Sequence, residues 1–139
     1  MGLNTNVLGF LAIFFSFAVL GCGCQANDNK PEIMYDYASR LKTIASGVDG
    51  LVKFGDGQSL SNEELLLKAV NGKNELLQFP EGYSLSVRVI GNNSEVMLCS
   101  NERALIEDTG CTAKSDLHHW QAETAVSCDF TLNLSDLCH

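Results

Sequence analysis

The spacing of the apolar residues changes at Pro80, and this change constrains the fold more than any other feature. Before Pro80, apolar residues recur at steps of three and four, which is typical of amphipathic helices. After it, apolar and polar residues alternate, which is typical of strands with one buried face. Helices followed by strands predict an α+β fold, with the helices on one side of a mostly antiparallel sheet.

The first helix is predicted to begin at Pro31. The backbone N–H groups in the first turn of a helix have no acceptor within the helix, so the N–H that proline lacks costs no hydrogen bond there. Gly47 and Gly50 each cost about 1 kcal/mol in a helix interior, so we expect the end between Ser46 and Lys53. Its apolar face would consist of Ile33, Met34, Tyr37, Leu41, Ile44, Val48 and Leu51.

The start of the second helix has a clear signature. Ser61, with Glu64 three residues later, forms the pattern of a capping box. Asn71-Gly72 is predicted to end this helix, because both residue types tolerate a positive φ. A short helical continuation is expected to stop at Phe79, before Pro80.

About four strands are predicted after Pro80. Residues 83–89 alternate in polarity, and Gly91-Asn92-Asn93 would turn the chain into a return strand over residues 96–99. Residues 104–106 would form the third strand. Residues 126–134 alternate again and predict the fourth.

Four cysteines, Cys99, Cys111, Cys128 and Cys138, form an even set near the C-terminus. No pair has the short spacing of a metal site or a Cys-x-x-Cys redox motif, so two disulfides and no metal or other cofactor are expected. Loop closure favours the nearest pairs, Cys99 with Cys111 and Cys128 with Cys138. An unbroken strand over residues 126–134 would put the second pair near its limit of reach, so the connectivity stays open.

Residues 7–21 are uncharged and apolar and are followed by Cys22. As a helix they would extend about 22 Å, short of a hydrocarbon core of roughly 30 Å. The ending Val19-Leu20-Gly21-Cys22 resembles the bacterial lipoprotein signal. The resemblance implies that residues 1–21 are a removed signal peptide, that Cys22 carries lipid such as palmitate, and that the protein lies outside the cytoplasm. Residues 22–30 would be a polar tether, and residues 31–139 a single domain.

Other interpretations of the N-terminus stay open. In one, the apolar segment is retained as a membrane anchor. In another, Gly9-Phe10 and the apolar residues after it resemble the start of a type IV pilin. That resemblance implies processing after Gly9 and an unbroken helix through about Ser46, although Phe14 stands where pilins carry a glutamate. Asn92 and Asn133 lie in glycosylation triplets, which would suit a secreted eukaryotic protein.

The charge balance bears on the partner. The chain holds 9 basic and 17 acidic residues, for a net charge of −8. Proteins that bind nucleic acids or anionic lipid surfaces concentrate Lys and Arg, so neither is expected as a direct ligand. Membrane contact would come through the lipid on Cys22.

Two clusters suggest chemistry. His118-His119-Trp120 could include a metal ligand oriented by Asp116 or Glu107, but adjacent side chains point in different directions, and we expect a surface loop with Trp120 packed on the sheet edge. Glu107-Asp108 could be an acid–base pair, but adjacent acids at a strand end are usually solvated. The aromatic residues Tyr35, Tyr37, Tyr83 and Trp120 could form a recognition patch, with Tyr37 and Tyr83 expected in the core instead.

The sequence therefore predicts a non-enzymatic cell-envelope lipoprotein, with a small disulfide-stapled domain that binds or scaffolds another envelope protein. Three alternatives belong to other classes. They are an inhibitor or immunity protein acting on an extracytoplasmic hydrolase, a type IV pilin-like subunit, and a metal-dependent enzyme built on His118 and His119.

Overall fold

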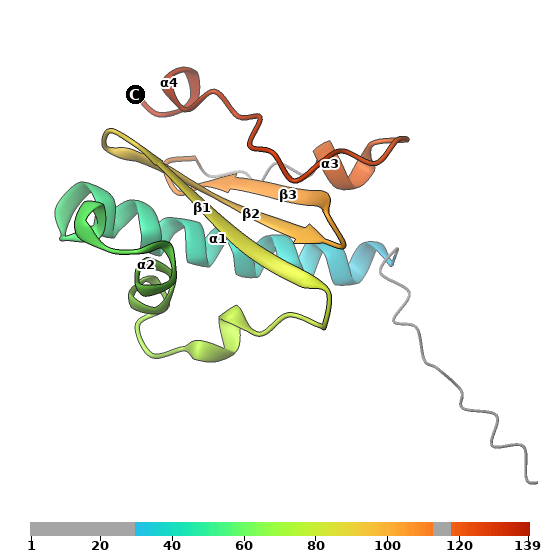
Figure 1. Cartoon of the computed structure of the whole chain (residues 1–139), viewed down its shortest axis with the longest axis horizontal. Coiled ribbons are helices and arrows are strands. Elements are labelled where there is room, and N and C mark those ends of the chain that lie inside the picture. The colour runs from blue at the N-terminus through green and yellow to red at the C-terminus, as the bar shows by residue number, and fades with distance from the viewer. Residues whose placement is uncertain (1–29, 113–117) are drawn as a thin grey trace, which may run out of the picture.

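The computed structural model describes residues 30–112 and 118–139 and has the predicted α+β fold (Figure 1). The predictions made for residues 1–29 lie outside this part. The main helices are α1 (Pro31–Phe54) and α2 (Asn62–Ala69), and the strands are β1 (Tyr83–Ile90), β2 (Asn93–Ser100) and β3 (Arg103–Thr109). Short helical turns are η1 (Gly57–Ser59), η2 (Asn74–Leu77), α3 (His118–Gln121) and α4 (Leu134–Leu137).

Helix α1 begins at Pro31, as predicted, and extends one residue beyond the predicted limit. Its last turn is closed by the N–H of Gly55, which donates to the carbonyl of Leu51. Gly47 has a packing reason, because a Cβ there would lie 2.3 Å from the backbone oxygen of Ala69. The helix thus accepts a poor helix former so that α2 can pack closely against it.

The capping box of α2 is confirmed. The Ser61 side chain accepts a hydrogen bond from the Glu64 N–H, and the Ser61 N–H donates to Glu64 Oε2 at 3.0 Å. Asn71 and Gly72 follow the helix with φ of 47° and 82°, as the ending signal predicted. The chain then forms η2 and an extended stretch before entering β1.

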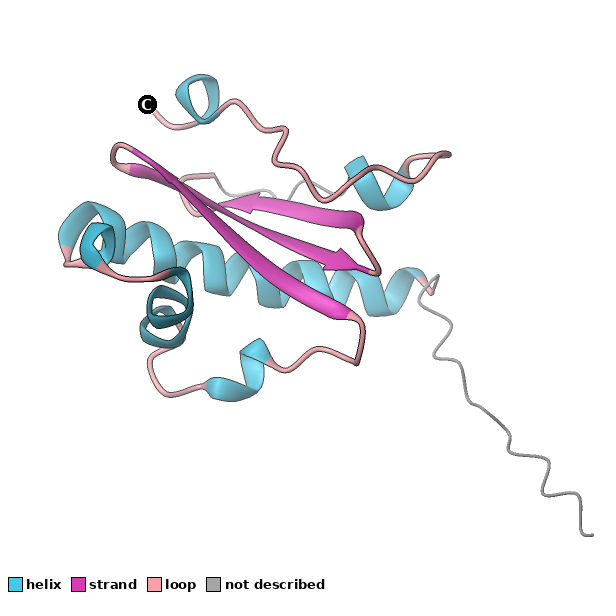
Figure 2. Ribbon diagram, viewed as in Figure 1, coloured by secondary structure: helices cyan, strands magenta, loops and turns pink. Residues whose placement is uncertain are grey.

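In the described residues the strands form one antiparallel sheet in the order β1-β2-β3. The β1–β2 hairpin closes with the pair Ile90↔Asn93, which leaves Gly91 and Asn92 as a two-residue turn. Such a turn specifies the register of the whole hairpin. Helix α1 crosses one face of the sheet, and the C-terminal segment 118–139 lies over the other (Figure 2).

The main core lies between α1 and the sheet. Val87, Val96 and Leu98 face α1, and the fully buried Leu41 and Ile44 meet them from the helix. On the opposite face, Met97, Cys99 and Ala104 form a smaller cluster with Cys128 and Phe130. The predicted helical face of α1 is confirmed by this packing.

The predicted fourth strand is wrong. Residues 126–133 form an isolated bridge, between Ser127 and Arg103, and no strand, and Leu134 begins α4. In this segment, side chains form hydrogen bonds with backbone groups that a neighbouring strand would otherwise bind. Glu107 Oε1 accepts the Thr131 N–H at 2.7 Å, and the Arg88 guanidinium donates to the Leu132 carbonyl at 2.9 Å. The alternating pattern arises because the segment lies flat across a sheet face.

The disulfides join Cys99 to Cys128 and Cys111 to Cys138, so the nearest-neighbour pairing that loop closure favours does not form. Each doubling of a loop costs only about 0.6 kcal/mol in closure entropy, which packing easily outweighs. Segment 118–139 passes over the sheet, where it brings Cys128 onto Cys99 of β2, and then reaches Cys111 just after β3. Both bridges therefore attach the C-terminal segment to the sheet region.

Candidate functional site

Titratable residues gather between the sheet and the C-terminal segment. The carboxylate of Glu107, on β3, is fully buried and lies 3.2 Å from His119 Nε2 of α3. The Thr131 hydroxyl donates to Glu107 Oε2 at 2.9 Å and lies 3.1 Å from His119 Nε2. Together with the Thr131 N–H, these contacts give both carboxylate oxygens of Glu107 a partner.

A second ion pair lies on the same face. Arg88 of β1 and Glu95 of β2 are directly opposite in register, and the guanidinium donates to Glu95 Oε1. Burial raises the pKa of Glu95 to about 7, because the pairing with Arg88 only partly offsets desolvation and the nearby Glu107 adds repulsion. Glu95 Oε2 is buried and has no hydrogen-bond partner within the described residues.

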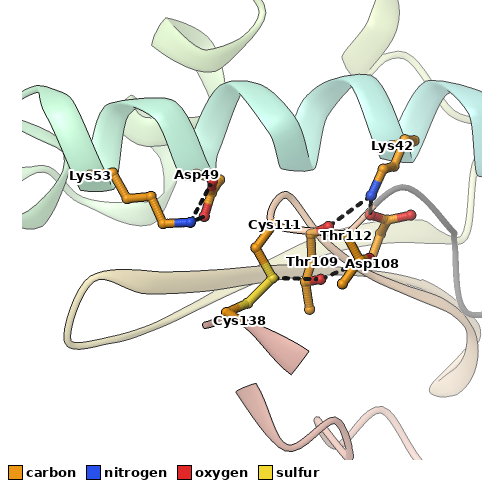
Figure 3. Close-up of a disulfide and its surroundings, with 8 residues drawn as sticks. All are labelled: Lys42, Asp49, Lys53, Asp108, Thr109, Cys111, Thr112 and Cys138. Atoms are coloured by element: carbon orange, nitrogen blue, oxygen red, sulfur yellow. Dashed lines mark hydrogen bonds and ion pairs between the residues drawn. A yellow bond between two sulfur atoms is a disulfide. The ribbon is translucent and has the colours of Figure 1, made fainter. Parts of the chain in front are cut away.

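Asp108 points to the opposite face from Glu107, as neighbours on a strand must. Lys42 of α1 binds Asp108 Oδ1 and the Thr109 carbonyl, each at 2.9 Å (Figure 3). The nearby Cys111 Sγ, which is bonded to Cys138, lies 3.3 Å from Thr109 Oγ1. Glu107 and Asp108 are buried on opposite faces, so the expectation of a solvated pair is wrong, and they do not form one acid–base site.

The expectation of a surface loop around His118-His119-Trp120 is also wrong. These residues belong to α3, and His119 is buried against Glu107, the carboxylate that the sequence offered as its orienting partner. Trp120 packs on the main core and edge-to-face on Tyr35, with ring centres 6.2 Å apart. Asp116 and the His118 side chain lie outside what the structure describes.

Within residues 30–112 and 118–139, no group of three or more His, Cys, Asp or Glu residues could hold a metal ion. Arg88, Glu95 and Glu107 of the sheet form a polar cluster with His119 and Thr131 of the C-terminal segment, in which Glu95, Glu107 and His119 are buried. Its groups bind one another and the backbone of that segment, so its arrangement suits attachment of the segment to the sheet. The sequence interpretation missed Arg88 and Glu95, although the register of a hairpin with a two-residue turn places them opposite each other.

The aromatic residues separate into two groups. Tyr37 is buried and Tyr83 is half-buried, and both rings contact Phe79 edge-to-face or in a stack. The prediction that Tyr37 and Tyr83 lie in the core is confirmed. The Arg40 guanidinium lies 4.2 Å from the centre of the Phe79 ring and binds backbone carbonyls of residues 75, 76 and 78. It holds the segment before β1 against α1.

An open apolar groove lies beside this aromatic cluster. It has a volume of about 300 Å³ and is lined by Glu63, Leu66, Leu67, Leu77, Phe79, Tyr83, Ser84 and Leu85. The sequence interpretation missed this site. A signal existed in Leu65-Leu66-Leu67, because a helix on the surface cannot bury three successive side chains: Leu65 is buried, while Leu67 is 47% exposed.

Over the described part of the chain, no helix combines the length and apolar character needed to cross a membrane. Cys22 and the resemblances at the N-terminus lie outside that part. The chain matches no protein-family model, no curated protein and no solved structure.

Proposed function

We propose that this protein is a non-enzymatic, lipid-anchored protein of the cell envelope whose folded domain binds a partner protein. The single observation that carries the binding role is the contrast between two sites. Glu95, Glu107 and His119 are buried between the sheet and the C-terminal segment, whereas the open groove is lined mainly by apolar side chains. A catalytic site needs reactive groups that reach the substrate, while apolar grooves are typical of binding surfaces.

The disulfides support a location outside the cytoplasm. Cys99–Cys128 and Cys111–Cys138 engage all four cysteines of the folded domain. Disulfides persist in oxidising compartments and are rare in the cytosol. Export is also what the apolar segment before Cys22 predicts, so two separate features of the chain favour the same compartment.

The pilin-like alternative receives less support. It predicts a helix that continues unbroken from Phe10 through about Ser46. Lys30 has an extended backbone, with φ −76° and ψ 120°, and α1 begins only at Pro31. A lipidated Cys22 followed by a tether requires no helix across this junction.

Intact mass spectrometry of the protein from its native host tests the proposal. We expect an N-terminus at Cys22 with added acyl mass, and two disulfides counted by alkylation before and after reduction. An N-terminus at Phe10 would favour the pilin-like alternative. An unprocessed Met1, together with four free thiols at Cys99, Cys111, Cys128 and Cys138, would contradict the proposal.

A further inference from the structure

We infer that the apolar groove and the adjoining edge of β1 bind an extended, apolar and basic segment of a partner protein, which adds to the sheet as a strand beside β1. This inference rests on the proposed binding function and names the class of partner. It depends on three observations: the free edge of β1, the apolar lining of the groove, and the acidic residues around it.

The hairpin determines which backbone groups of β1 point outward. Residues that close a two-residue turn exchange hydrogen bonds with each other, and such pairs alternate along an antiparallel ladder. With Ile90↔Asn93 as the closing pair, the N–H and C=O groups of Leu85, Val87 and Val89 point away from β2. The Val87 carbonyl indeed accepts a hydrogen bond from Asn62 Nδ2 of α2, at 3.1 Å.

This contact protects the middle of the edge, and at its start the Tyr83 N–H donates to the Pro80 carbonyl at 3.2 Å, so the open part beside the groove is centred on Leu85. Within the described residues, no side chain or loop forms a hydrogen bond with the outward-pointing N–H or C=O of Leu85. Proteins usually cover or charge such edges, because a free edge pairs with other strands. An added strand would reach Leu85 before meeting α2 at Val87.

The groove would receive the side chains of that added strand. Leu66 and Leu67 of α2 form one wall, and Leu77 and Phe79 come from the segment before β1. In an extended peptide every second side chain points the same way, so alternate apolar residues would enter the groove. Main-chain pairing with pockets for alternate side chains is the established mode of strand addition.

Charge complementarity selects a basic partner. Glu63 lines the groove, and Glu75 and Glu81 lie two residues before the lining residues Leu77 and Tyr83. All three are exposed, and no ion pair involves them within the described residues. Of the bases near the groove, Lys68 is paired with Asp56 at 2.7 Å, and the half-buried Arg40 beside Phe79 binds three backbone carbonyls. Lys73 is left as the exposed base.

Selection from a phage-displayed library of random seven-residue peptides, on the oxidised full-length chain, tests this inference. We expect enriched peptides to alternate apolar and polar residues and to carry Lys or Arg. Fluorescence polarisation with the enriched peptide should show an increase in Kd of about tenfold for Leu67→Lys. Phe54→Lys is the matched control, because Phe54 is 90% exposed and lies outside the groove; its Kd should stay within about twofold of wild type. Circular dichroism checks that both variants fold.

The main-chain contribution is tested separately. N-methylation of alternate peptide bonds, on the edge that would face β1, should abolish binding, and methylation of the other edge should not. Enrichment of acidic peptides, absence of enrichment, or equal binding of both methylated forms would overturn the inference. So would dimerisation of the wild-type chain that Leu67→Lys abolishes, because a second copy would then occupy the groove. Mass spectrometry of the N-terminus is independent of the groove, so the inference can fail while the proposed location stands.

Discussion

The two faces of the sheet are covered in different ways. Helix α1 covers one face with a continuous apolar stripe, in which Leu41, Ile44 and Val48 are fully buried. Segment 118–139 covers the other face with little regular structure, and two disulfides and the polar cluster attach it. Apolar burial needs no exact partner atoms, whereas each hydrogen bond on the second face does.

This difference shows why one face could be predicted and the other could not. A helix buries its own apolar stripe wherever the sheet lies, so its period is visible in the sequence. The contacts of the C-terminal segment join residues far apart in the chain, such as Arg88 with Leu132 and Glu107 with Thr131. The stability of the C-terminal segment therefore depends on a few specific bonds. Substitutions that remove buried groups from each face in turn test this difference.

The largest loss of stability is expected from a substitution in the core between α1 and the sheet. Ile44→Ala should lower the free energy of unfolding by about 2–5 kcal/mol, because it removes buried methyl groups and leaves a cavity. Urea denaturation followed by circular dichroism measures the change. Ser39→Ala, at an exposed position of the same helix, should change stability by no more than about 0.5 kcal/mol. A loss below about 1 kcal/mol for Ile44→Ala would show that this face is not the main source of stability.

The double variant Cys99→Ala/Cys128→Ala should lower stability by about 3 kcal/mol, because the bond closes a loop of 29 residues. The protection of backbone amides against hydrogen exchange should decrease mainly in residues 118–139, while the amides of α1 should still exchange slowly. Equal loss in both regions would mean that the two faces unfold as one unit. Peptide mapping of the unreduced wild type should recover the Cys99–Cys128 and Cys111–Cys138 pairs.

Glu107→Gln should cost about 1–3 kcal/mol, because an amide offers one acceptor oxygen where Thr131 uses both carboxylate oxygens. Urea denaturation gives the size of the loss. Glu123→Gln, an exposed change on the C-terminal segment, serves as the matched control. If the two variants have equal stability, the hydrogen bonds between Glu107 and Thr131 contribute nothing measurable.

The last comparison between the faces concerns pH. Burial raises the pKa of Glu95 from the usual 4.5 to about 7 in the folded protein, so the folded state holds this proton after the unfolded state has lost it. The contribution of Glu95 to stability should then decrease as pH rises from 4.5 to 7, by up to about 3 kcal/mol. Thermal unfolding of wild type and Glu95→Gln across this range isolates the effect.

The pKa of Glu64 is shifted in the opposite direction from that of Glu95, which provides a control. Its hydrogen bonds with Ser61 lower its pKa, so its contribution should be lost as pH falls below the usual value of 4.5. Glu64→Gln should therefore leave the change between pH 4.5 and 7 intact. Parallel profiles of wild type and Glu95→Gln over that range would contradict the assignment to Glu95.

Much of the fold was predictable from local signals. Pro31, the Ser61–Glu64 capping box and the turn at Gly91-Asn92 each act within a few residues of themselves, and each lies where the sequence placed it. The α+β class follows from the change of period at Pro80. The errors concern residues 126–134, the cysteine pairing, and the burial of Glu107, Asp108 and His119.

These errors share a cause. Alternating polarity shows that a segment lies flat on a surface, but it does not tell whether backbone or side-chain groups bind it. A carboxylate such as Glu107 looks solvated until its partners, His119 and Thr131, are brought to it. The groove likewise requires α2, η2 and β1 to meet, although the surplus leucines of α2 indicated an unburied apolar side.

By itself, the sequence determined the helices, the β-hairpin and the segregation of helix from sheet, because these depend on periodicity and on caps and turns that act over short distances. Only the tertiary structure decided which cysteines pair, which charges are buried, and where an open apolar edge remains. Those outcomes depend on how the C-terminal segment crosses the sheet, and this path is set by contacts between residues that are distant along the chain.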